Sequence, residues 1–87
     1  MIKLTSIAVK GEAELELGFS DGSCGLWSAA ALIARATELT QPLADRVYFA
    51  RAFIEAGALA WPNGLELSAP SLHRRLEEAG LLVRRAA

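Results

Sequence analysis

The chain has 87 residues, 53% of them hydrophobic, and a formal net charge of −1 at pH 7, and this length fits one domain over residues 1–87. No apolar run approaches the ~20 residues that cross a bilayer, and the N-terminus lacks the features of a signal peptide, so we expect a cytoplasmic protein with no membrane partner. The near-neutral charge gives no electrostatic reason to expect nucleic acid, and the single cysteine, Cys24, excludes an internal disulfide and a multi-cysteine zinc site.

Two segments at the start of the chain predict neighbouring strands. Ile2 to Val9 is rich in β-branched residues, and Glu12 to Phe19 alternates apolar and acidic side chains, which is the period of a strand with one buried face. Lys10-Gly11 is the expected turn between them. The apolar phase slips after Leu4, which predicts either a β-bulge near Thr5-Ser6 or a late strand start.

Asp21-Gly22 predicts a second tight corner, because a type I′ turn needs positive φ at both central residues and this dipeptide suits it. In a two-residue loop, Leu17 faces Leu26 on the next strand. This register places Cys24 and Leu26 on the same buried face as Leu17.

A helix is expected from about Ala29 to Glu38, with Ser28 as its N-cap. Leu32 and Ile33 belong to its apolar stripe. Thr40-Gln41-Pro42 ends it, and the segment Asp45 to Tyr48 is expected to form a turn or a single helical turn.

A second β-meander follows, and two turn signals divide it. Its expected parts are the strand Ala50 to Glu55, the turn Ala56-Gly57, the strand Ala58 to Trp61, the type I′ turn Asn63-Gly64 and the strand Leu65 to Leu67. In this register Ile54 faces Leu59, and Trp61 faces Glu66.

The last helix is expected to begin near Ser68 or Ala69, with Pro70 in its first turn and Gly80 just past its end. Leu81 to Ala87 are open to three interpretations: a short strand, a partner contact or a loose tail. The predicted fold class is α+β, with two small antiparallel β-meanders, each followed by a helix, in the order β-β-β-α-β-β-β-α.

The run Trp61-Pro62-Asn63-Gly64 resembles the small bacterial family called domain of unknown function 2442. The elements that support the resemblance in order are Phe19-Ser20-Asp21-Gly22, Pro42-Leu43-Ala44-Asp45, Phe49, Leu67 and Leu72. The match extends from about Leu15 to Leu76, and the chain departs from the family's pattern at Glu66 and at Trp27-Ser28. The resemblance implies a small α+β fold and, from relatives that look like half of a two-gene pair, a small toxin-like partner.

Four residues are candidates for contact with a partner or ligand: Trp27, Trp61, Asn63 and Glu66. The run Trp61 to Gly64 has two interpretations, a recognition loop with the indole as an anchor or a tight turn beside a core tryptophan, and turn chemistry already explains each residue. Trp27 is expected on the face opposite Leu26, beside Glu16. It is either an exposed contact or a residue packed under the following helix.

Other polar groups give weaker signals. Cys24 and His73 would need a third, orienting residue to form a nucleophile–base pair, and His73 is expected on the charged face of the last helix, so we predict no enzymatic activity. The acidic strand residues and the basic residues near the end are expected to be solvated, and no metal or other cofactor is predicted. These residues are Glu12, Glu14, Glu16, Arg74, Arg75, Arg84 and Arg85.

The leading hypothesis is therefore a non-catalytic protein-interaction domain. Its partner would be a second copy of the chain or the product of a neighbouring gene, with an antitoxin-like role as the narrower version. Two alternatives remain open: a small-ligand-binding module with Trp61, Asn63 and Glu66 in a cleft, and a regulator that contacts DNA through its basic C-terminal end.

Overall fold

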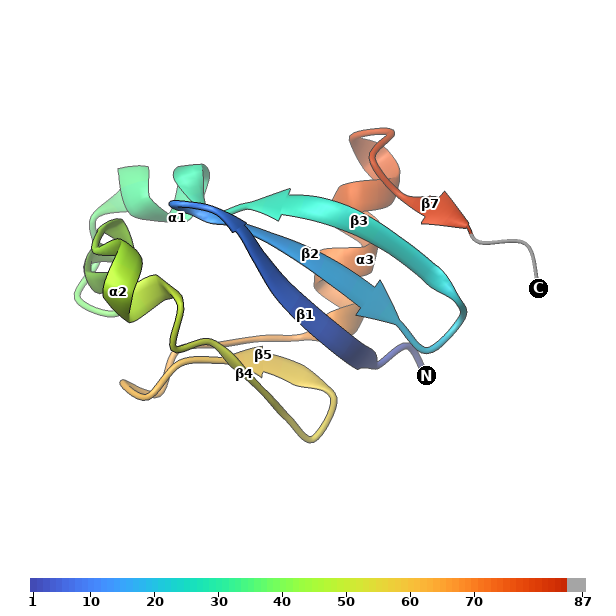
Figure 1. The fold of residues 1–87 in the computed structure, drawn as a ribbon, viewed down its shortest axis with the longest axis horizontal. Coiled ribbons are helices and arrows are strands. Elements are labelled where there is room, and N and C mark those ends of the chain that lie inside the picture. The colour runs from blue at the N-terminus through green and yellow to red at the C-terminus, as the bar shows by residue number, and fades with distance from the viewer. Residues whose placement is uncertain (85–87) are drawn as a thin grey trace.

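The computed structural model describes residues 1–84 and has the predicted α+β architecture, with two antiparallel sheets and helices (Figure 1). The larger sheet has the strand order β1-β2-β3-β7, and the smaller has the order β4-β5-β6. The elements in chain order are β1 (Leu4–Gly11), β2 (Glu14–Phe19), β3 (Ser23–Ser28), α1 (Ala30–Arg35), the 3-10 helix η1 (Gln41–Ala44), α2 (Arg46–Phe49), β4 (Phe53–Glu55), β5 (Ala58–Ala60), β6 (Glu66–Leu67), α3 (Ala69–Glu78) and β7 (Val83–Arg84).

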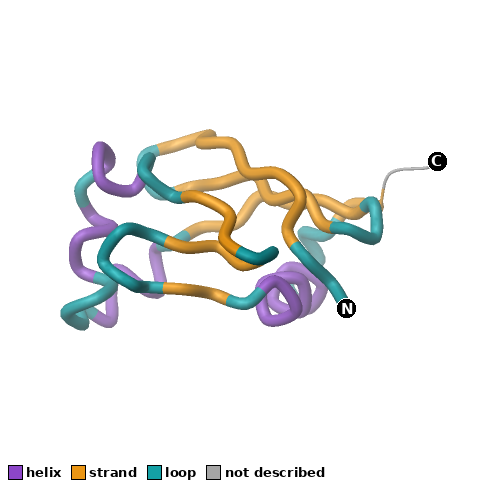
Figure 2. The backbone as a smooth tube through the Cα atoms, turned by 90° about the horizontal axis from the view of Figure 1, so that it is seen from below, coloured by secondary structure: helices purple, strands orange, loops and turns teal. Residues whose placement is uncertain are grey.

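The elements form two layers. The larger sheet is one layer, and the smaller sheet and α3 lie together on one of its faces, with the short helices α1, η1 and α2 gathered at one end (Figure 2). The opposite face of the larger sheet carries no helix within residues 1–84. Over the same residues, no helix combines the length and the apolar character that crossing a lipid bilayer requires.

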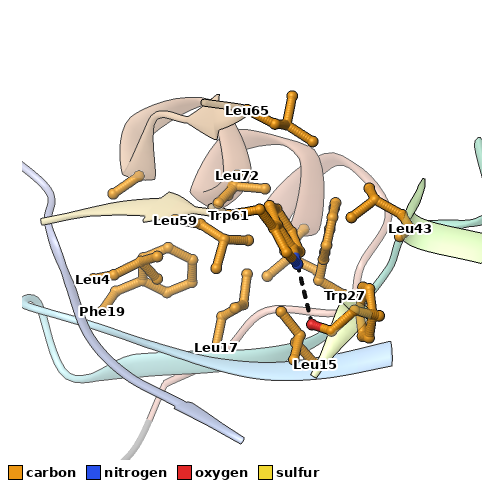
Figure 3. Close-up of a cluster of buried hydrophobic side chains, with 14 residues drawn as sticks. Leu4, Leu15, Leu17, Phe19, Trp27, Leu43, Leu59, Trp61, Leu65 and Leu72 are labelled. Carbon is orange, nitrogen blue, oxygen red and sulfur yellow. Dashed lines mark hydrogen bonds between the residues drawn. The ribbon is translucent and has the colours of Figure 1, made fainter. Parts of the chain in front are cut away.

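The core lies between the two layers. Leu15, Leu17 and Phe19 of β2 are at most 3% exposed, which confirms the apolar face predicted from their alternation. Trp61 belongs to the same core and is 1% exposed, and its ring centroid lies 5.8 Å from that of Phe49. Its indole Nε1 donates a hydrogen bond of 3.0 Å to the carbonyl oxygen of Phe49, so the buried polar atom has a partner (Figure 3).

The first strand runs further than expected. The bulge predicted near Thr5-Ser6 is confirmed, because the pairing of β1 with β2 skips Thr5. A second irregularity skips Lys10 and lets β1 continue until Gly11 pairs with Glu14, so the turn lies at Glu12-Ala13. The prediction of a turn at Lys10-Gly11 was wrong because a bulge absorbs one residue and extends the strand.

The hairpin at Asp21-Gly22 exists, but its register differs by one residue from the prediction. Leu17 pairs with Gly25 and Glu16 with Leu26, because the loop holds Ser20 as well as Asp21 and Gly22. Within this loop φ is positive at Gly22 alone, which fits a type I turn closed by a left-handed glycine and rules out type I′. Leu26 therefore lies on the open face of the sheet and is 42% exposed.

The loop at Asn63-Gly64 is built in the same way, and the pairing of its strands also differs by one residue from the prediction. The backbone N–H of Trp61 donates to the carbonyl of Leu65 at 3.0 Å, so Trp61 faces Leu65 and the predicted partner Glu66 pairs with Ala60. Within this loop, Gly64 alone has positive φ. A three-residue loop again replaces the expected two-residue loop.

The pairing at the remaining corner of the small sheet is as predicted. Ile54 faces Leu59 across the turn Ala56-Gly57, and both turn residues have positive φ. A type I′ turn therefore occurs where the sequence offers Ala-Gly. The strand before it is shorter than predicted, since residues 50–52 complete the turn after α2.

Helix α1 is shorter than the predicted span of residues 29–38. The Ser28 hydroxyl accepts a hydrogen bond from the backbone N–H of Ala30, although Ala29 occupies the N-cap position. The helix ends at Ala36, which is left-handed with φ of 50°. Beyond it, reciprocal hydrogen bonds between Thr37 and Thr40 satisfy backbone groups outside the helix, which explains the early end.

Helix α3 begins and ends as predicted. The Ser68 hydroxyl accepts from the N–H of Ser71, and the N–H groups of Gly80 and Leu81 donate to the carbonyls of Glu77 and Leu76 in a Schellman motif. This reversal leads into β7, which pairs with β3. Of the three interpretations of residues 81–87, the short strand is correct for Val83–Arg84, and the prediction for residues 85–87 lies outside the described residues.

Candidate functional site

The structure places both tryptophans of the predicted contact set in the core. Trp27 is 7% exposed and pairs with Leu15, so the one-residue change in register turns it inward and not toward Glu16. The ring centroids of Trp27 and Trp61 lie 6.4 Å apart (Figure 3). Of the two interpretations considered for each tryptophan, a packed residue and an exposed contact, the packed residue is therefore correct for both.

Asn63 lies on the surface, and its polar atoms are used to fix the loop. Its Oδ1 accepts from the N–H of Leu65, its Nδ2 donates to the carbonyl of Leu39 at 3.1 Å, and its backbone N–H donates to the Tyr48 hydroxyl at 3.0 Å. Glu66 is exposed on β6. Asn63 thus joins its loop to two earlier segments. Within residues 1–84, the Glu66 side chain forms no ion pair.

A polar cluster that the sequence analysis did not find surrounds Asp21. Its Oδ2 lies 2.9 Å from His73 Nε2 and 3.1 Å from Arg84 Nη1, while its Oδ1 accepts from the hydroxyl and the backbone N–H of Ser23. The donated bonds of Ser23, with a further contribution from His73, hold the pKa of the Asp21 carboxyl well below its usual value, although partial burial opposes the shift. A carboxylate therefore joins the β2–β3 hairpin to α3 and β7.

His73 is not on a solvated face, contrary to the prediction. Its side chain is 12% exposed, and its ring packs edge-on against Phe19 with centroids 5.1 Å apart. Cys24 pairs with Gly18 and lies between the inward positions Ser23 and Gly25, so it belongs to the opposite face of the sheet. The two residues considered as a nucleophile–base pair are separated by the sheet.

A second surface feature is the free edge of β1. Next to its C-terminal end, a groove of about 580 Å³ separates β1 from α2, and its apolar lining includes Val9 and Val47, which are 50% and 71% exposed. Glu12 and Arg46 form an ion pair of 3.9 Å across the groove. The groove combines exposed apolar side chains with an unpaired strand edge.

The remaining charged candidates have different surroundings. Arg74 and Arg75 are exposed on α3, as expected of a solvated face. Arg84 is bound to Asp21, so the basic end is partly neutralised, and Arg85 lies outside the described residues. Within residues 1–84, no group of three or more His, Cys, Asp or Glu side chains is arranged to hold a metal ion.

Comparison with known proteins identifies a family. The family model described as Protein of unknown function (DUF2442) matches residues 4–78, which is most of the chain and includes both Asx-Gly loops. No curated protein and no solved structure is significantly similar to the chain.

Proposed function

We propose, from the premise that this chain belongs to the DUF2442 family, that it is a non-catalytic domain of the bacterial cytoplasm that binds a second polypeptide along the edge of β1. The second polypeptide is another copy of the chain or the product of a neighbouring gene. An antitoxin-like role toward a small toxin is the narrower form of the same proposal.

The observation that carries this proposal is the length and exposure of the β1 edge. The strand has 8 residues and pairs with β2 on one side. On its other side, within residues 1–84, one backbone hydrogen bond is made, from Leu4 to Gly57 at the very start of the strand. A strand edge of this kind can pair with an extended segment of another chain through backbone hydrogen bonds.

The groove beside the edge supports the same proposal. Val9 and Val47 are exposed on its walls, and covering two such side chains would contribute on the order of 1 kcal/mol each. Backbone pairing along β1 would add affinity without demanding a particular partner sequence. The apolar groove would then supply the selectivity.

The arrangement of the reactive side chains supports a non-catalytic role. The His73 ring is held by Asp21 and Phe19, and Cys24 lies on the other face of the sheet. A general base must lie within hydrogen-bonding reach of the group that it activates, and these two residues do not meet that requirement.

The proposal is tested by the mass of the full chain in solution. Sedimentation equilibrium across the micromolar range should show reversible self-association, and hydrogen exchange should show protection of the β1 amides that rises with protein concentration. Val9→Lys and Val47→Lys should weaken association, because each places a charge in the groove. Val83→Lys is the matched control, since Val83 is 58% exposed on the distant strand β7.

Co-expression with the neighbouring gene's product tests the other partner. A stable complex that Val9→Lys disrupts and Val83→Lys preserves would support the proposal. A chain that is monomeric at every concentration and that is also recovered alone from co-expression would rule it out.

A further inference from the structure

A second groove, of about 110 Å³, lies between β3, α1, β6 and α3, and no residue of β1 lines it. Its floor is apolar and includes Trp27 and Leu72, which are 7% and 2% exposed, with Leu67 half-buried beside them. Two exposed arginines, Arg35 from α1 and Arg75 from α3, also line it. The groove therefore pairs an apolar base with a positively charged entrance.

The charge at the entrance is not neutralised by the lining. No aspartate or glutamate lines the groove, and within residues 1–84 neither Arg35 nor Arg75 forms an ion pair. Glu78 lines an adjoining hollow together with Arg75, and the two form no ion pair. Two guanidinium groups that flank an apolar floor favour a ligand with an apolar group next to carboxylates.

The size of the groove decides what kind of ligand fits. Small-molecule sites usually enclose about 300–1,000 Å³, and even benzene occupies a cavity of ~150 Å³. A groove of about 110 Å³ has room for one apolar side chain and cannot enclose a free metabolite. The occupant is therefore a side chain that belongs to a larger, acidic molecule.

Helix α1 supplies an independent reason to expect a polypeptide at this place. The helix contains no buried residue, and Leu32, which lines the groove, is only half-buried. Short helices gain most of their stability from tertiary packing. A partner segment laid along the groove would cover Leu32 and complete the packing of α1.

We infer that the groove between α1 and α3 binds an acidic segment of a partner protein. One leucine-sized side chain enters the floor over Trp27 and Leu72, and carboxylates on either side of it pair with Arg35 and Arg75. This site lies apart from the edge of β1, so the inference does not depend on strand pairing.

The experiment is an NMR titration of the ¹⁵N-labelled chain with a short acetylated peptide in which one leucine stands between aspartates and glutamates. Shift changes should concentrate on the backbone amides of Leu32, Leu67 and Ser71, and added salt should weaken binding. Arg35→Glu and Arg75→Glu should each weaken binding by at least about tenfold. Arg74→Glu, the same charge change one residue away and outside the groove, should change it by less than about twofold.

Three results would overturn the inference. The first is no shift change in the groove at millimolar peptide, and the second is an equal effect of Arg74→Glu and Arg75→Glu, which would indicate unspecific charge attraction. The third is equal affinity for isocaproate, a free carboxylate with a leucine-like tail, which would identify a small-ligand site. A peptide with alanine in place of leucine should bind more weakly, because the floor would stay uncovered.

Discussion

The loops at Asp21 and Asn63 are built alike but connected differently. In each, an aromatic residue precedes a three-residue loop, the Asx Oδ1 accepts from the backbone N–H two residues on, and a glycine with positive φ closes the turn. The second polar atom of the side chain has different partners in the two loops. Asp21 Oδ2 binds His73 and Arg84, whereas Asn63 Nδ2 donates to the carbonyl of Leu39. The same local hydrogen bond to Oδ1 thus fixes both turns. The other polar atom of each side chain, Oδ2 of Asp21 or Nδ2 of Asn63, determines which distant segment the loop binds.

The two loops therefore connect to the rest of the molecule through different kinds of interaction. The first loop holds α3 and β7 through a charge, so that connection depends on pH. The second holds the segments around Leu39 and Tyr48 through hydrogen bonds that involve no carboxylate and no basic side chain. Four sets of substitutions test this contrast, in order of decreasing expected effect.

The largest effect is expected at the aromatic residue before each loop. Trp61→Phe should lower the free energy of unfolding by about 2–4 kcal/mol, because it leaves a cavity and removes the donor to the buried carbonyl of Phe49. Phe19→Leu keeps an apolar side chain with no hydrogen bond to lose and should cost less than about 1.5 kcal/mol. Urea unfolding followed by circular dichroism measures both. Equal losses would contradict the unequal anchoring of the two loops.

The glycines test what the loops share. Gly22 and Gly64 have φ of 86° and 94°, and a Cβ at either position would meet no atom within 4 Å. Alanine at each position should therefore cost about 1–2 kcal/mol from backbone strain alone. Thermal unfolding of the two variants should give similar losses. A loss at one position only would show that the loops are not equivalent.

Asp21→Asn tests the charged connection from Asp21 to His73 and Arg84. The variant keeps an acceptor for Ser23 but loses the charge that faces His73 and Arg84, so it should lose about 1 kcal/mol at neutral pH. Because folding lowers the pKa of Asp21, its contribution is present above the unfolded value near ~4 and disappears as the pH falls below it. Urea midpoints should therefore converge for wild type and variant in acid. A constant gap at every pH would refute this role.

Asn63→Asp is the reciprocal change, with the smallest expected effect. The introduced carboxylate can still accept from Leu65, but it loses the donor to Leu39 and places an oxygen against that carbonyl. The loss should be about 0.5–1 kcal/mol at neutral pH and should shrink near pH ~4, where protonation restores a donor. Asn63→Ala, measured in parallel, should show no such pH dependence.

Local patterns predicted the element order but not the exact pairing of the strands. The alternation of β2 and the caps of α3 depend on neighbouring residues, so they could be recognised in the sequence. An Asx-Gly dipeptide requires positive φ at glycine but leaves open whether the loop holds two or three residues. That one residue reversed the faces of Leu26 and Trp27.

The polar cluster and the grooves were beyond sequence reasoning for a different reason. Asp21, His73 and Arg84 meet only because α3 crosses the sheet and β7 returns to β3. Gly25 allows that crossing, since a Cβ there would lie 2.9 Å from the carbonyl oxygen of Leu81. A contact between residues so far apart in the chain leaves no periodic signal.

The two borders of the larger sheet are unequal, and this difference bears on the proposed pairing along β1. Within residues 1–84, the border formed by β1 is long and open, whereas the border formed by β7 consists of Val83–Arg84, and the Arg84 side chain is held by Asp21 of the β2–β3 loop. A sheet that can be extended on both sides polymerises, but a sheet with one usable side stops after a single addition. Under the proposed pairing along β1, the return of the chain after α3 would therefore favour closed pairs over fibres.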